Sequence, residues 1–147
     1  MLPLEETVCR ETDVCVCVAD MLVSLRYVQI HTRSSHSPEE RHPSAKVQAA
    51  ACYSLCYLTA NPANRVRIAA EGGIGALLGA MQRHPASAKV QESACITLWN
   101  LVGNADNKVK VKSAGAEDAA KRAMALKDAT ADTKEWGRKL LDRLKNV

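Results

Sequence analysis

Hydrophobic residues recur at the period of an α-helix between residues 86 and 104. When each residue is turned by about 100°, one set of apolar side chains gathers on one side of the helix, and Glu92, Ile96, Trp99 and Asn100 occupy the other. The residues on the apolar side are Val90, Ala94, Leu98, Leu101 and Val102. We therefore expect a helix that buries this stripe and turns its opposite face outward.

The same pattern is present twice in the chain. Residues 44–72 align with residues 87–115 without a gap, and 13 of the 29 aligned positions are identical, at a period of 43 residues. In the first copy the apolar stripe is Val47, Ala51, Leu55 and Leu58. The opposite face differs at every position between the copies. Stacked copies must match in shape, so we expect the stripe to pack and the other face to be free to vary.

Each copy is predicted to contain three helices of increasing length. In residues 61–104, Asn61 and Asn64 are candidate N-caps of a short first helix, which a pair of glycines ends. A second helix begins at Ile74 and ends before Pro85. The stretch with the apolar stripe forms the third and longest helix.

These units resemble armadillo repeats. The resemblance lies in "NRVRIAAEGGIGALLGAM" followed by "AKVQESACITLWNL", and again in "NKVKVKSAGAEDAAKRAM". It implies an all-α, right-handed solenoid of about three armadillo-like repeats, the first and last atypical, in a single domain. The expected divisions are a degraded first repeat at 1–60 with a loop insertion at 31–43, an intact repeat at 61–104 and a C-terminal capping repeat at 105–147. Residues 14–30 and 132–146 are expected to be helical.

The resemblance also implies that the third helices line a concave groove. Three of the five aromatic residues, Tyr53, Tyr57 and Trp99, lie on the outward face of these helices. Asn100 matches the asparagine with which family members bond a peptide backbone, whereas Ile96 replaces the family's tryptophan. The predicted partner-binding residues are Lys46, Ala49, Tyr53, Tyr57, Lys89, Glu92, Ile96, Trp99 and Asn100.

We expect this groove to bind another protein or an extended peptide, with the two lysines favouring acidic residues in it. The chain is expected to be a monomer. One alternative is a structural fragment of a larger array whose outward face contacts only further repeats. A second alternative is nucleic-acid binding through the C-terminal part, because residues 104–147 carry 11 Lys and Arg against 7 Asp and Glu. A net charge of +4 is low for a nucleic-acid surface.

The remaining chemistry of the sequence favours a binding module over an enzyme. No nucleophile, base and orienting group are spaced as a catalytic set, so we expect neither catalysis nor a cofactor. His42 and His84 each precede a proline at the same point of the two copies, which a duplicated helix end explains better than metal binding. The six cysteines lack the spacing of a zinc site and follow an acidic start, which indicates reduced thiols in the cytoplasm or nucleus. No apolar run has the roughly 18–20 residues that span a bilayer.

Overall fold

The computed structural model describes residues 45–146, which form seven helices and no strand. The helices are α2 (Ala45–Leu58), α3 (Pro62–Ala70), α4 (Gly73–Arg83), α5 (Ala88–Leu101), α6 (Ala105–Ser113), α7 (Ala116–Ala125) and α8 (Ala131–Lys145). The all-α expectation is therefore confirmed for this part of the chain. The helix predicted at 14–30, the loop predicted at 31–43 and His42 lie outside the described residues.

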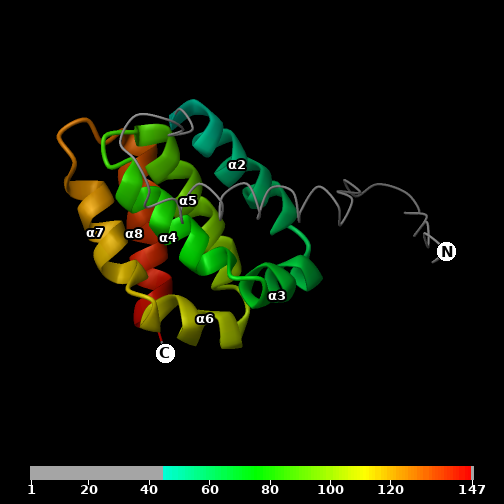
Figure 1. The fold of residues 1–147 in the computed structure, drawn as a ribbon. Coiled ribbons are helices and arrows are strands. Elements are labelled where there is room, and N and C mark those ends of the chain that lie inside the picture. Colours follow the sequence, from blue (N-terminus) through cyan, green and yellow to red (C-terminus); the bar gives the residue numbers. More distant parts are fainter. Residues whose placement is uncertain (1–44, 147) are drawn as a thin grey trace, which may run out of the picture.

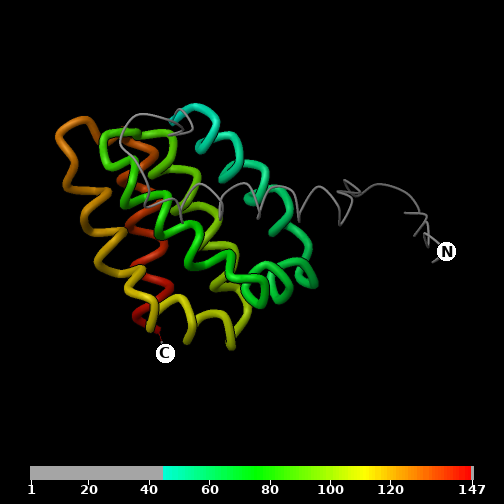
Figure 2. The backbone as a smooth tube through the Cα atoms, viewed as in Figure 1, coloured from blue at the N-terminus to red at the C-terminus, as the bar shows by residue number. Residues whose placement is uncertain are grey.

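The three long helices pack side by side, with α5 between α2 and α8 (Figure 1). Helices α4 and α7 pack on α5 and α8 and on each other, while the short helices α3 and α6 lie together at one end of the long ones. The tube in Figure 2 follows the chain through a short, a medium and a long helix from α3 to α5, and through the same order again from α6 to α8. The predicted succession of helices is thus present twice.

The short helices begin at asparagines that are 43 residues apart. The side-chain oxygen of Asn61 accepts from the N–H of Ala63 at 2.9 Å, and that of Asn104 accepts from the N–H of Asn107 at 3.0 Å. Each bond satisfies one of the main-chain donors that a helix start leaves without a partner. Asn64, the other candidate cap, instead donates to the carbonyl oxygen of the last residue of α2 at 3.0 Å.

Two glycines turn the chain from the short helix into the medium one. Gly72 and Gly115 occupy the same position of the repeat, and their φ angles are 84° and 86°. This left-handed region is favourable only for a residue without a Cβ, so each glycine makes the turn possible. Further along, α4 ends at Arg83, close to the stop that Pro85 predicted. The helix predicted over 86–104 begins at Ala88, because Ser87 caps it, and ends at Leu101.

The apolar stripe of α5 forms the centre of the core. Its predicted members Val90, Ala94, Leu98, Leu101 and Val102 are between 0% and 4% exposed. These residues are enclosed because α5 contacts helices on several sides, namely α2, α4 and α8.

The stripe of the first copy is buried only in part. Leu55 and Leu58 are buried, and Ala51 is half-buried. The prediction that Val47 belongs to the buried stripe is wrong, because this side chain is 42% exposed. Among the described helices α2 packs chiefly on α5, so the first turn of α2 lacks the enclosure that α5 receives.

Side chains from later helices bond to main-chain carbonyl oxygens of the helix about one repeat earlier. The hydroxyl of Thr97 shares its one hydrogen between the carbonyl oxygen of Ser93 on its own helix, at 2.7 Å, and that of Cys52 on α2, at 3.1 Å. The amide of Asn107 donates to the carbonyl oxygen of Arg65 at 2.9 Å. Two more such bonds run from Thr133 to Ala88 at 3.4 Å and from Arg143 to Trp99 at 3.3 Å. Three of these bonds join the long helices α2, α5 and α8 to one another, and the bond of Asn107 joins the short helices α6 and α3.

Candidate functional site

A pocket of about 480 Å³ opens between the first halves of α2 and α5. Helix α2 contributes Ala45, Lys46, Ala49, Ala50 and Tyr53, and α5 with its capping residue contributes Ser87, Lys89, Glu92 and Ser93. Five of the nine predicted partner-binding residues are among them, and most of the exposed wall is apolar. A second pocket, of about 370 Å³, lies between α4 and α7 and contains none of the nine.

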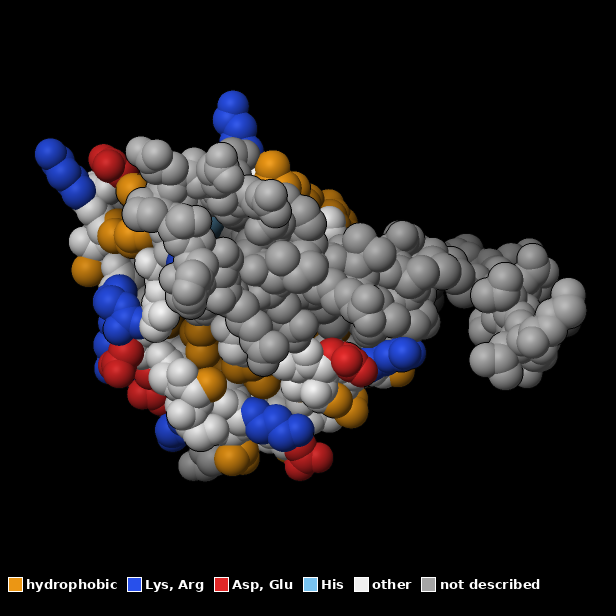
Figure 3. Space-filling view, in the orientation of Figure 1, with side chains coloured by type: hydrophobic (Ala, Val, Ile, Leu, Met, Phe, Trp, Pro, Cys, Tyr) orange, Lys and Arg blue, Asp and Glu red, His pale blue; other side chains and the backbone are white. Residues whose placement is uncertain are grey.

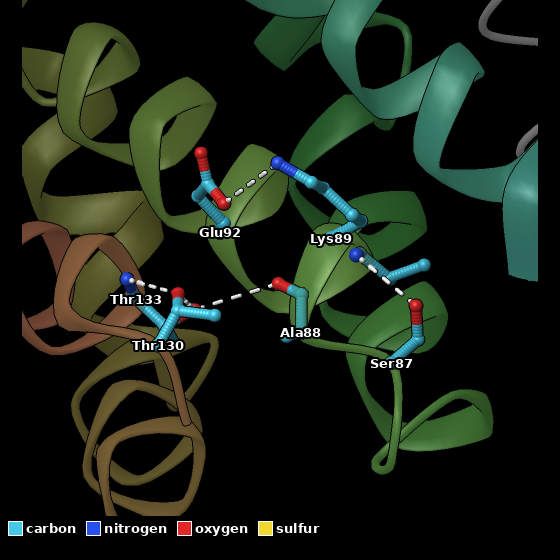
Figure 4. Close-up of polar contacts among 7 residues, drawn as sticks. Ser87, Ala88, Lys89, Glu92, Thr130 and Thr133 are labelled. Atoms are coloured by element: carbon cyan, nitrogen blue, oxygen red, sulfur yellow. Dashed lines mark hydrogen bonds and ion pairs between the residues drawn. The ribbon is translucent and has the colours of Figure 1, made fainter. Parts of the chain in front are cut away.

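The charged groups at the pocket come from both helices. On α5, the Lys89 ammonium lies 3.5 Å from the Glu92 carboxylate, with side chains that are 77% and 18% exposed (Figure 4). Lys46, one repeat earlier, is exposed at the start of α2. Figure 4 also shows Thr133 reaching the carbonyl oxygen of Ala88, which holds the start of α8 against the start of α5. This end of the long helices is therefore mildly basic.

Two tyrosines form the aromatic side of the pocket. Tyr53 lines it directly, and Tyr57 follows one turn later on α2. Their rings meet edge to face with centroids 4.8 Å apart, and their hydroxyl oxygens are 2.9 Å apart. The rings are 49% and 56% exposed. The hydrogen bond to Tyr57 is the main cause that raises the pKa of Tyr53, so the Tyr53 hydroxyl stays protonated at neutral pH.

Asn100 is placed differently from the other predicted residues. Its amide nitrogen donates to the Thr59 hydroxyl at 2.9 Å and approaches the carbonyl oxygen of Cys56 at 3.5 Å. The donor half of this amide therefore holds α5 against the end of α2. Only its oxygen is left to accept a hydrogen bond from a peptide N–H.

Trp99 lies at the junction of α5 and α8 rather than at the pocket. Its half-buried ring meets Trp136 edge to face, with centroids 5.6 Å apart, and the Arg143 guanidinium lies 4.4 Å from its centroid. Ile96 is half-buried between the two groups of residues. Of the nine predicted residues, five line the pocket at α2 and α5, and Trp99 belongs to an aromatic cluster at α5 and α8. The other three, Tyr57, Ile96 and Asn100, line neither.

The α8 members of this cluster were missed in the sequence. Arg143 follows Asn100 by 43 residues, and Lys139 follows Ile96 by the same interval. Extending the repeat register into a third copy would have found both positions. The identities there are unrelated to those in the earlier copies, so the similarity of residues alone gave no signal.

The structure offers no metal site or reactive thiol in residues 45–146. No three His, Cys, Asp or Glu side chains cluster there in a way that could hold an ion. Burial raises the pKa of Cys52 and of Cys95 to about 12, and it also raises the pKa of the half-buried Cys56. These thiols pack as small apolar side chains and are not thiolates at neutral pH.

Two further properties bear on the class of partner. Among helices α2–α8, none is long and apolar enough to cross a membrane. On the face drawn in Figure 3, acidic and basic side chains are interspersed over the coloured residues, without one large area of a single sign. A nucleic-acid surface is usually a continuous basic area, which this face does not provide.

No protein-family model, curated protein or solved structure matches the chain at a significant level. The proposals below therefore rest on the residues and geometry described above.

Proposed function

We propose that this chain is an armadillo-like solenoid that binds an extended peptide segment of a partner protein across its long helices. The supporting observations are the repeated order of short, medium and long helices and the left-handed glycines Gly72 and Gly115 at equivalent turns. The parallel packing of α2, α5 and α8 creates one continuous surface made by the third helix of each unit.

The observation that carries the proposal is the pocket beside two exposed tyrosines. Its volume of about 480 Å³ falls within the range of ligand pockets and exceeds the space that one apolar side chain fills. Tyr53 and Tyr57 expose about half of their surfaces next to it. Aromatic rings beside a pocket are the usual anchors of protein interfaces, because they bury a large area at low cost in conformational entropy. An apolar side chain of the peptide enters this pocket.

The lysines at the pocket add a preference in charge. Lys46 and Lys89 lie at the start of the long helices, and Glu92 offsets only one of them. Exposed lysines are strongly hydrated and contribute mainly to the rate and selectivity of association. A peptide with acidic residues near its anchor is therefore favoured over a basic one, and contacts this few support an affinity of roughly micromolar order.

The test is binding of the full chain to an array of 12-residue peptides, followed by titration of the strongest hits. Tyr53→Ala and Tyr57→Ala should each weaken binding by about tenfold, because each removes a ring at the pocket. Val66→Ala is the matched control, since this side chain is 51% exposed on α3 and lies away from the pocket. Strongest hits that are rich in Lys and Arg, and that both tyrosine variants still bind, would place the peptide elsewhere.

One observation favours the alternative of a structural fragment. Three of the five large hydrophobic residues that are exposed in residues 45–146, namely Val47, Tyr53 and Tyr57, lie on α2. A helix from another repeat could cover them in a longer array. Sedimentation distinguishes the two functions: a monomer that unfolds cooperatively supports an independent module, and self-association through α2 supports the fragment.

A further inference from the structure

We propose that the peptide-binding surface contains a carboxylate site on α8, centred on Arg143, that selects an Asp or Glu about five residues from the anchor side chain. This inference rests on the proposed function and gives it a sequence preference. It concerns residues that the aromatic cluster at α5 and α8 brings together and that the pocket does not contain.

The Arg143 guanidinium is held by two contacts with Trp99. Its carbon lies 4.4 Å from the centroid of the indole ring, and its Nη1 donates to the main-chain carbonyl oxygen of Trp99 at 3.3 Å. A guanidinium carries five N–H donors in a rigid plane, so most of them remain after this one bond. Stacking on an aromatic ring fixes the plane and leaves its edge for bidentate contact with a carboxylate. The site is therefore preorganised before a ligand arrives.

Two acidic side chains of α8, Glu135 and Asp142, are already paired with lysines. On α8, the Glu135 carboxylate lies 2.6 Å from the Lys139 ammonium, and the Asp142 carboxylate lies 3.3 Å from that of Lys145. The Lys139 ammonium also lies 4.2 Å from the centroid of the Trp136 ring. Arg143 has no carboxylate within ion-pair distance among residues 45–146. The cluster thus presents one fixed cation that lacks an anionic partner within the described chain.

The position of Arg143 relative to the pocket gives the spacing of the ligand. Arg143 follows Asn100 and Tyr57 by one and two repeats of 43 residues, so the three lie at the same level of neighbouring parallel helices. The pocket lies between α2 and α5. Arg143 belongs to α8, the next long helix, and donates a hydrogen bond to Trp99 of α5. Packed helices are about 8–10 Å apart. In repeat register Arg143 also lies roughly nine residues beyond the level of the pocket, which adds about 13 Å at about 1.5 Å per helical residue. The combined distance of about 16 Å corresponds to about five residues of an extended chain, which advances about 3.3 Å per residue.

A carboxylate fits this site better than it fits the lysines at the pocket. Lys89 already has Glu92 at 3.5 Å and is 77% exposed, so it remains hydrated and mobile. Arg143 is half-buried and stacked, so a hydrogen bond to it is formed in a drier place and with less loss of side-chain freedom. The strongest charge preference should therefore come from α8 and not from the lysines that the sequence pointed to.

The test uses acetylated and amidated peptides that carry one Leu in a Gly–Ser background. A single Glu is moved through the five positions on each side of the Leu, and every peptide has a counterpart with Gln in place of Glu. The full chain contains only two tryptophans, Trp99 and Trp136, and both belong to the cluster. Peptides without tryptophan can thus be titrated into the chain while the fluorescence of its tryptophans is measured. This signal reports directly on the Arg143 site.

We expect the peptide with Glu about five residues from Leu to bind about five- to tenfold more tightly than its Gln counterpart. Arg143→Gln should abolish this difference, and Arg143→Lys should retain part of it. Arg138→Gln is the matched control, because it removes the same charge from the exposed surface of α8 outside the cluster. The unfolding temperature of each variant confirms that the fold is retained.

Equal binding of Glu and Gln peptides at every spacing would overturn the carboxylate site and leave the pocket intact as a peptide site. A loss of the Glu preference in Arg138→Gln as large as in Arg143→Gln would also overturn it, because general charge attraction would then explain the effect. Absence of binding by every peptide, with the chain natively folded by circular dichroism, would count against both the site and the proposed function.

Discussion

Two valines of α6 allow a matched test of the core. Val111 is fully buried and Val109 is 60% exposed, yet they lie two residues apart on the same short helix. Replacing either by alanine removes the same atoms and changes helix propensity by the same amount. The difference in unfolding free energy between Val111→Ala and Val109→Ala therefore isolates the burial of one side chain.

The expected difference can be worked from these exposures. Removing two buried methyl groups costs about 1.6 kcal/mol in transfer free energy, at about 0.8 kcal/mol for each. A cavity of roughly 40 Å³ adds about 1 kcal/mol, and the higher helix propensity of alanine returns about 0.5 kcal/mol. Val111→Ala should therefore destabilise the chain by about 2 kcal/mol. For Val109→Ala the small loss of contact and the gain in propensity nearly cancel.

Urea unfolding followed by far-UV circular dichroism measures both values, provided that the m-value is the same in the two variants. At roughly 4 °C per kcal/mol for a chain of this size, Val111→Ala should also lower the unfolding temperature by about 8 °C. Equal destabilisation by the two variants, or a larger effect of Val109→Ala, would mean that α6 does not pack on α3, α5 and α7 through the face assigned to it.

Three further outcomes follow from buried groups. Leu98→Ala should cost about 2–5 kcal/mol of unfolding free energy and Ile96→Ala less, and the reverse order in urea melts would mean that the faces of α5 are exchanged. Asn107→Ala removes an amide that is 2% exposed and donates to a main-chain oxygen of α3. Calorimetry should therefore show a loss of about 1–3 kcal/mol in unfolding free energy. A loss below about 0.5 kcal/mol would contradict that hydrogen bond, because a buried hydrogen bond usually contributes at least that much. Burial raises the pKa of Cys52 and Cys95 from 9.0 to about 12, so both thiols stay protonated in the folded chain at a pH where they ionise in the unfolded chain. The unfolding free energy should therefore be at its full value below pH 9 and should fall as the pH rises towards 12. The Cys52→Ala/Cys95→Ala variant should show a shallower fall in urea melts over that range, and an unchanged slope would refute the assignment.

The repeat made much of the fold predictable. Each period of 43 residues contains the residue types that begin and end helices. The N-caps at Asn61 and Asn104 and the left-handed turns at Gly72 and Gly115 could therefore be placed from the sequence. The burial of side chains on α2, the first described helix, could not be predicted in the same way. Val47 and Val90 are the same residue in the same register, and their exposures differ because α2 and α5 have different neighbours.

The part of the candidate site that depends on the position of residues along each helix could be predicted from the sequence. The part that depends on contacts between side chains of different helices could not. Helical phase was sufficient to bring Lys46, Tyr53 and Glu92 to one pocket. It could not show that the Asn100 amide is engaged by the end of α2, nor that α8 covers part of Trp99. Such contacts depend on the side chains of a neighbouring helix, whose identities change from one copy to the next.

The bonds that join successive helices have a consequence for how such a chain can change over generations. In four of them the donor is a side chain of the later helix and the acceptor is a main-chain oxygen of the earlier one. Every amino acid supplies that main-chain oxygen, so the outward side chains of the earlier helix can be substituted without losing the hydrogen bond between the two helices. Insertion of a second copy of residues 61–103 would keep a donor and an acceptor at every joint. A chain joined in this way is free to lengthen by whole units and to diversify the surface that it offers to partners.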